Sequence, residues 1–253
     1  MKTISILMAT YNPNPSYLKL CLDSIESQTF NDFQLVLIDD GCTNCNLENA
    51  LKGYSFKYKI IKNEINLGLP ASLNKGLLYC DSEYIARMDD DDIMMHNRLE
   101  LELEYAQKHD GMIFSKVRKI DSKGNEVFFD DSDEDVVKYL KKSGNCLTHS
   151  TLFVKRSILV DCGGYNKLFT YAQDYELYMR LINNVKFYVM KERLLYYRIQ
   201  DGVSTAKKVM SLLFCYGAAV IYFLNNKSKK NLFYFFRRSL SMMKFFFLSF
   251  LRS

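Results

Sequence analysis

Short apolar segments alternate with segments of helical periodicity over the first 88 residues, and this alternation constrains the fold more than any other feature. The helical patterns cover Tyr17 to Gln28 and about Pro70 to Cys80. Apolar runs of this length fit buried strands; the expected strands are residues 3–9, 33–38, 57–61 and 83–88. Strands that alternate with helices predict parallel β-α units joined by crossover helices. We therefore expect an α/β fold with a mostly parallel central sheet flanked by helices.

Polar side chains follow three of the expected strands, at the point where each strand ends. These clusters are Thr10-Tyr11-Asn12, Asp39-Asp40-Gly41 and Asp89 to Asp92. In parallel sheets, ligands bind at the carboxyl ends of the strands. The three clusters should therefore converge on one cleft.

The run Asp89 to Asp92 places four consecutive carboxylates at the end of an apolar strand. Like charges near 4 Å repel by about 1 kcal/mol per pair even in water. A divalent cation would relieve this repulsion, and oxygen ligands suit Mg²⁺ and Mn²⁺. An ordinary solvated acidic loop is the alternative. A calcium loop of the EF-hand type is excluded, because Ile93 and Met94 occupy its fifth and sixth positions.

The order of motifs along the chain resembles the family-two glycosyltransferases, the inverting group with the nucleotide-sugar-binding A-type fold. The matching segments are Ser5 to Asn12, Ser24 to Phe30, Leu37 to Cys42, Asn66 to Leu69 with Leu73 to Leu77, Ile85 to Asp92, and Gly163 to Tyr165 with Gln173 to Leu177. The resemblance runs to about Ser204. It implies a Rossmann-like sheet and an enzyme of cell-surface polysaccharide biosynthesis. That enzyme would move a sugar from a nucleotide-diphosphate sugar, expected to be UDP-linked, to a hydroxyl of a glycan or lipid-linked glycan.

The resemblance also implies site residues. Asp89 and Asp91 would hold the metal, Mn²⁺ or Mg²⁺. Asp40 would accept a hydrogen bond from the base of the nucleotide, although Asp-Gly at this position also fits a simple turn. The residues implied to bind the nucleotide sugar are Thr10, Tyr11, Asn12, Asp40, Gly68, Asn74, Arg87, Asp89 and Asp90. Asp92 would assist them or only be hydrated.

Asp174 is the candidate catalytic base. Inversion at the sugar carbon needs a carboxylate that takes the proton of the acceptor hydroxyl. The family has Glu-Asp here, whereas this chain has Gln173-Asp174. His149 matches a family histidine and is either a site residue or a structural histidine. Gln200 stands near the position where relatives carry a histidine close to the metal, which puts a third protein ligand from this segment in doubt.

Two other functions fit part of this pattern. A metal-dependent nucleotidyltransferase also needs a base pocket and clustered carboxylates, but it would release pyrophosphate. A non-catalytic nucleotide-sugar-binding relative is the second alternative, and Gln173 favours it.

The last 51 residues are basic, aromatic and free of acidic side chains. They hold nine Lys and Arg and nine of the 18 Phe, so the preceding 202 residues carry a net charge of −4. Anionic lipid suits this composition better than nucleic acid. A packed helical layer is the alternative. The apolar stretch Val209 to Leu224 has 16 residues, short for a membrane span of about 20. We therefore expect a cytoplasmic protein, peripheral on the inner face of the cell membrane.

These patterns also predict a domain organisation. Residues 1–204 would form the catalytic domain, with a nucleotide-binding half at 1–108 and an acceptor and catalytic-base half at 109–204. Residues 205–253 would form basic, aromatic C-terminal helices.

Overall fold

The computed structural model describes residues 2–127, 135–142, 145–199 and 204–226. The chain forms two compact units that interleave along the sequence. The sheet unit comprises Met1–Asp131, Leu147–Tyr165 and Val185–Asp201. The helical unit comprises the remaining segments: Ser132–Cys146, Asn166–Asn184 and Gly202–Ser253. Segments on both sides of residue 204 thus belong to the helical unit, and the predicted catalytic domain 1–204 stays a prediction.

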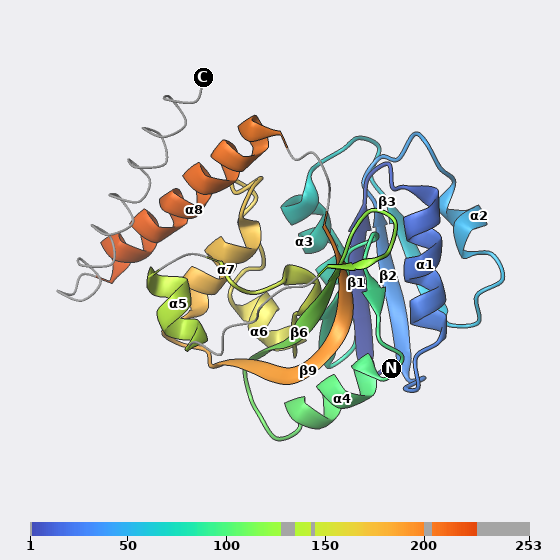
Figure 1. The fold of residues 1–253 in the computed structure, drawn as a ribbon, viewed down its shortest axis with the longest axis horizontal. Helices are drawn as coiled ribbons and strands as arrows, with labels where there is room; N and C mark the ends of the chain where they lie inside the picture. Colours follow the sequence, from blue (N-terminus) through green and yellow to red (C-terminus); the bar gives the residue numbers. More distant parts are fainter. Residues whose placement is uncertain (1, 128–134, 143–144, 200–203, 227–253) are drawn as a thin grey trace. The chain divides into compact units, whose positions relative to one another are not determined.

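The sheet unit is built on one mixed sheet with the strand order β3-β2-β1-β4-β8-β6-β9-β5 (Figure 1). Its first four strands are mutually parallel, as predicted; they are β1 (Ile4–Thr10), β2 (Phe33–Asp39), β3 (Lys57–Lys62) and β4 (Tyr84–Arg87). The others are β5 (Ile93–Met94), β6 (Met112–Ile120), β7 (Glu126–Val127), β8 (Phe153–Lys155) and β9 (Phe187–Arg198). Strand β8 is antiparallel to both β4 and β6, and β9 is parallel to β6.

Helices flank this sheet, and α1 and α3 lie where the apolar periodicity predicts them. The helices of the sheet unit are α1 (Pro15–Glu26), α2 (Leu47–Leu51), α3 (Leu69–Tyr79), α4 (Arg98–Ala106) and α6 (Arg156–Asp161), with the short 3₁₀ turn η1 (His149–Thr151). Helix α1 begins where the Asn14 side chain accepts from the Ser16 amide at 2.9 Å, an N-cap of the usual kind. It buries Leu18, Cys21, Leu22 and Ile25, the face that the periodicity predicts.

The sequence of strand β9 has two apolar segments, at residues 185–189 and 194–199, which by themselves are typical of two separate strands. The structure has one continuous strand, and its exposed centre, Lys191 to Arg193, explains the interrupted pattern. The register against β6 shifts between Phe114 and Lys116, so the charged segment lies in an irregularity of the ladder. A bulge of this kind leaves extra residues unpaired and free of the apolar alternation that marks a strand.

A buried ion pair in α4 contacts the end of β4. The Arg98 side chain of α4 donates from Nε to Glu102 at 3.0 Å and from Nη2 to the Arg87 carbonyl at 3.1 Å. Arg98 and Glu102 are both fully buried. Burial raises the pKa of Glu102 to about 7, although the Arg98 charge acts in the opposite direction. Helix α4 thereby fixes the strand end from which the acidic run departs.

The helical unit contains α5 (Val136–Lys142), α7 (Gln173–Leu181) and α8 (Thr205–Asn225). The Tyr175 hydroxyl donates to the Leu140 carbonyl at 2.8 Å and ties α7 to α5. The Tyr222 hydroxyl donates to Asn183 at 3.2 Å and ties the end of α8 to the segment after α7.

Helix α8 corrects the expectation that its apolar stretch is too short to cross a membrane. It has 21 residues. Its most apolar stretch of 18 residues has a mean hydropathy of 1.5, and 17% of that stretch is buried. By length and composition it is therefore compatible with a span. Residues 227–253 lie outside the described residues, as does Gln200.

Candidate functional site

The acidic run gathers three carboxylates beside the carboxyl end of β4. One carboxylate oxygen each from Asp89, Asp91 and Asp92 lies within 4.8 Å of the other two. The run leaves β4 where the Met88 amide donates to the Leu7 carbonyl of β1 at 3.1 Å. Strand β1 continues to Thr10, so the acidic residues lie alongside its last residues. This confirms that the first and third polar clusters meet.

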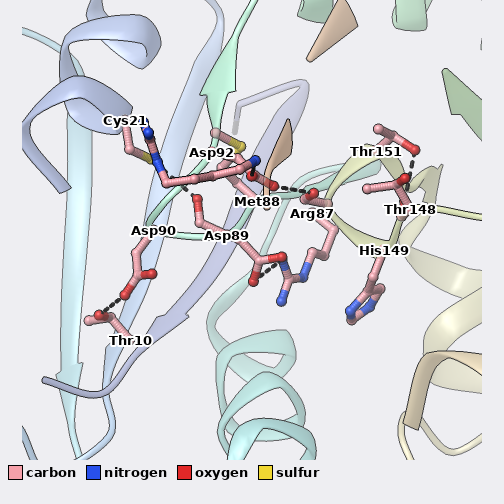
Figure 2. Close-up of polar contacts among 12 residues, drawn as sticks. Thr10, Cys21, Arg87, Met88, Asp89, Asp90, Asp92, Thr148, His149 and Thr151 are labelled. Carbon is pink, nitrogen blue, oxygen red and sulfur yellow. Dashed lines mark hydrogen bonds and ion pairs between the residues drawn. The ribbon is translucent and has the colours of Figure 1, made fainter. Parts of the chain in front are cut away.

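Asp89 and Asp90 point in opposite directions (Figure 2). Asp89 forms an ion pair with Arg87, which is 1% exposed. Asp90 accepts a hydrogen bond from the Thr10 hydroxyl at the end of β1. Burial raises the pKa of Asp90 to about 6, helped by the charges of Asp89 and Asp91 and opposed by the Thr10 hydrogen bond. Asp90 therefore links the acidic run to the first polar cluster.

Asp92 is fully buried and held by residues far along the chain. It accepts from the Ser150 hydroxyl at 2.5 Å and from the Arg198 amide at 2.8 Å. Burial, followed by the charges of Asp89 and Asp91, raises the pKa of Asp92 well above its usual range. Asp92, whose role the sequence leaves open, is thus part of the carboxylate cluster. Its partners Ser150 and Arg198 lie next to His149 and near Gln200, in segments that resemble the family, but the sequence assigns neither of them a role.

The three carboxylates fit a divalent cation. Hard oxygen donors are the ligands that Mg²⁺ and Mn²⁺ favour, and both ions bind through a few carboxylates together with substrate phosphates. Arg87 and the buried donors to Asp92 keep these side chains oriented. Close carboxylates repel one another, and a bound cation would remove that repulsion. Asp92 is therefore a candidate ligand beside the predicted Asp89 and Asp91.

The first two polar clusters also meet, since the Asp40 amide donates to the Thr10 carbonyl at 2.9 Å. Tyr11 is 51% exposed at this edge. Asn12 has a positive φ of 49°, and its side-chain oxygen accepts from the Thr43 amide at 2.8 Å. Asn12 thus holds the loop after β2 while Tyr11 is open to a ligand.

Asp40 has a structural task that the sequence does not predict. Its carboxylate accepts from Asn63 at 2.7 Å and from the amides of Leu67 and Gly68 at 2.9 and 3.0 Å. These bonds fix the turn that begins α3, and Gly68 adopts a positive φ of 83° there. The role of Asp40 and Gly68 in binding the donor stays a prediction.

Asn74 of α3 clamps the turn at Gly164 and Tyr165. Its side chain donates to the Tyr165 carbonyl and accepts from the Tyr165 amide, both at 2.7 Å. A Cβ at Gly164 would lie 2.3 Å from the Asn74 oxygen, and the φ of Gly164 is +71°. Both amide ends of Asn74 are therefore engaged within the protein, and its predicted contact with the donor stays a prediction.

His149 lies next to Arg87 in Figure 2, on the side away from Asp89. Its Nε2 is 2.8 Å from the Tyr165 hydroxyl, and the side chain is buried. Burial, followed by the charge of Arg87, lowers the pKa of His149 well below its usual range. A neutral imidazole bonded to Tyr165 fits the structural role, and the predicted site role is neither confirmed nor excluded.

Gln173 and Asp174 open α7 in the helical unit. The preceding residue, Ala172, has a positive φ of 53°. Asp174 accepts from the Asn145 side chain at 2.5 Å. Both residues are only partly buried, so Asp174 is accessible enough to meet a substrate. Its assignment as the base stays a prediction.

Comparison with known sequences identifies the family. Residues 5–176 match the model of Glycosyl transferase family 2. An uncharacterized glycosyltransferase of Methanocaldococcus jannaschii is 33% identical over 234 residues, which cover 88% of this chain and 80% of the relative. The O-antigen biosynthesis glycosyltransferase WbnJ of Escherichia coli is 30% identical over 239 residues, which cover 89% of this chain and 90% of WbnJ.

Solved structures share the fold at lower identity. S. aureus TarS 1-349, crystallised with UDP-GlcNAc, matches with a TM-score of 0.76 and 19% identity over 94% of this chain and 73% of that one. The mannosyltransferase PcManGT of Pyrobaculum calidifontis, solved with GDP-Man and Mn²⁺, matches with a TM-score of 0.71 and 13% identity over 95% of this chain and 70% of that one. This chain spans 44% of a longer TarS chain. The predicted A-type fold is confirmed. The chain therefore belongs to glycosyltransferase family 2 and is a glycosyltransferase.

Proposed function

We propose that this glycosyltransferase moves a sugar, with inversion, from a UDP-sugar to a hydroxyl of a glycan or lipid-linked glycan in cell-surface polysaccharide biosynthesis. The observation that supports the proposal is the carboxylate cluster of Asp89, Asp91 and Asp92, which the Thr10–Asp90 hydrogen bond joins to the first polar cluster. A donor-binding site needs a diphosphate end and a base end at one edge of the sheet, and these two clusters would supply them.

The relatives support the choice of substrates. WbnJ is named for O-antigen biosynthesis, and an Erwinia amylovora relative is named for amylovoran biosynthesis. A further E. coli relative, 28% identical over 71% of this chain, is named as a galactosyltransferase that uses UDP-Gal and a diphosphoundecaprenol-linked sugar. These names favour a nucleotide-linked donor and a lipid-linked acceptor for this chain.

The residues around the acidic run would bind the two ends of the nucleotide-sugar donor. When bound, a divalent cation would offset the charge of the leaving diphosphate. Asp89, Asp91 and Asp92 would hold it, and Arg87 orients Asp89. The exposed ring of Tyr11 would lie against the nucleotide base.

Asp174 would complete the reaction as the general base. A carboxylate within hydrogen-bond reach of the acceptor hydroxyl takes its proton as the oxygen attacks the sugar carbon opposite the leaving diphosphate. The bond to the sugar carbon forms as its bond to the diphosphate breaks. The Asn145 side chain, which donates to Asp174 at 2.5 Å, would hold that carboxylate in position.

A donor screen tests this function. We expect a metal-dependent release of nucleoside diphosphate from one nucleotide sugar, and a UDP-sugar to give the fastest turnover. Chromatography of the products distinguishes the reactions, because a nucleotidyltransferase would release pyrophosphate instead. Release of pyrophosphate, or no turnover of any nucleotide sugar with a broad set of acceptors, would overturn the proposal.

We further infer that the C-terminal segment binds the cytoplasmic face of the membrane. Residues 227–253 contain seven basic and no acidic residues. Each basic residue near an anionic surface contributes about 1 kcal/mol. Helix α8 adds exposed apolar side chains, namely Met210, Leu213, Ile221 and Leu224.

Removal of residues 227–253 should lower binding to anionic lipid vesicles by at least about tenfold, because most of the electrostatic attraction is lost. Co-sedimentation with vesicles measures this, and uncharged vesicles serve as the control. If the segment is instead a packed layer, the truncation would leave vesicle binding unchanged and lower the melting temperature.

A further inference from the structure

A groove on the sheet unit lies next to the acidic run and has no assigned role. It is bordered by the first turns of α1, by β5, by the turn between β6 and β7, and by the end of β9. Its volume is about 570 Å³. Sites for small molecules have volumes of about 300 to 1,000 Å³. We call it the α1–β9 groove.

The lining of the α1–β9 groove combines aromatic, aliphatic and charged residues. It includes Tyr17, Tyr196 and Ile93. Lys123 adds a donor, and Glu126, which also pairs with Arg118 at 3.0 Å, adds an acceptor. A pyranose ring has the matching character, with C–H groups on its faces and hydroxyls around its edge. Such hydroxyls both donate and accept, so they suit a rim that offers both kinds of group.

Arg198 also lines the groove and is buried, with 3% exposure. Its Nη1 donates to the Asp121 carbonyl at 3.0 Å, and its guanidinium stacks on the Tyr17 ring at 4.0 Å from the centroid. Among the described residues, its Nη2 has no hydrogen-bond partner. Buried donors in folded proteins are almost always paired, so this one calls for an acceptor oxygen.

The same arginine connects the groove to the carboxylate cluster. Its Nε donates to the Asp91 carbonyl at 3.0 Å, and its amide donates to the Asp92 carboxylate at 2.8 Å. Arg198 would therefore separate a molecule in the groove from the carboxylate cluster. The groove is thus close to the cluster but is not part of it, which suits a sugar unit other than the one that is transferred.

We propose that the α1–β9 groove binds a sugar unit of the acceptor glycan, with Arg198 donating to one of its oxygens and the two tyrosines packing against its faces. This inference rests on the proposed function. The chemistry of the lining favours a carbohydrate, and the contact with the acidic run favours the acceptor.

A tryptophan at the rim tests the groove without touching the carboxylates. Ser16 is exposed, and its side chain lines the groove. Ser16→Trp should raise the KM for the acceptor by about tenfold or more, as loss of pocket contacts does, while the KM for the donor stays unchanged. Ser27→Trp, at the exposed other end of α1, is the matched control. Equal acceptor KM values for Ser16→Trp and the control would overturn the proposal.

A binding experiment separates this inference from the proposed function. Lactose, maltose and N,N′-diacetylchitobiose serve as probes, and NMR follows the ring protons of Tyr17 and Tyr196. At least one probe should shift these signals in the unmodified protein and in Ser27→Trp, but not in Ser16→Trp. The absence of any shift in the unmodified protein would contradict sugar binding in the groove. A failed donor screen together with shifted tyrosine signals would contradict only the proposed function.

Discussion

Asp91→Asn is expected to lower kcat/KM by at least about 10²- to 10³-fold, the loss seen when one group that stabilises charge in a transition state is removed. An amide oxygen is a weaker ligand than a carboxylate for a hard divalent ion. The cluster would keep only Asp89 and Asp92 as charged ligands. Initial rates of nucleoside diphosphate release at several Mn²⁺ concentrations measure the effect.

The thermal stability of the same variant distinguishes a loss of catalysis from a loss of folding. In the absence of metal, Asp91→Asn removes one of several repelling charges, so the melting temperature should not fall. Mn²⁺ should stabilise the unmodified protein, because a ligand that binds only the folded state raises stability, and it should stabilise the variant much less. Asp110→Asn is the matched control, since the Asp110 side chain is 77% exposed and pairs with Lys155. Full activity of Asp91→Asn would show that the cluster has no catalytic task.

Asp174→Asn is expected to lower kcat by about 10²- to 10⁴-fold, the usual contribution of a general base. The variant keeps the shape of the side chain but cannot take the proton of the acceptor. Because the donor site is intact, the affinity for the nucleoside diphosphate should not change. Stopped assays with saturating donor and acceptor measure kcat, and calorimetry measures nucleotide affinity.

Asp161→Asn, at the exposed end of α6, serves as the control for Asp174→Asn. The acidic limb of the pH–rate profile should also disappear in the Asp174 variant, because that limb reports the protonation of the base. Retained turnover with an unchanged profile would show that another group acts as the base.

The first half of the fold follows from the sequence because its signals are local. The apolar runs of β1 to β4 and the periodicity of α1 and α3 identify the elements, and their alternation dictates parallel pairing. The second half carries weaker local signals. Strands β5 and β7 have two residues each. The charged centre of β9 interrupts its apolar pattern, so the sequence favours two short strands. Pairing with β6 shows one continuous strand.

The site likewise combines a local signal with long-range contacts. Four adjacent aspartates favour a metal site from the sequence alone. What each aspartate does depends on partners distant in the sequence, such as Thr10 for Asp90 and Arg198 for Asp92. No spacing rule could find the latter contact, which joins residues 106 positions apart. The clamp of Asn74 on Tyr165 escapes prediction for the same reason.

The carboxylate cluster is proposed to be the diphosphate end of a donor site that works with a divalent cation. Calorimetric titration of UDP into the protein, once with Mn²⁺ and once with the metal removed by a chelator, tests this most directly. We expect UDP to bind at least about tenfold more tightly with Mn²⁺, a difference of about 1.4 kcal/mol, and Asp91→Asn to lose that gain. Equal affinities with and without Mn²⁺, or an undiminished gain in Asp91→Asn, would contradict this role of the cluster.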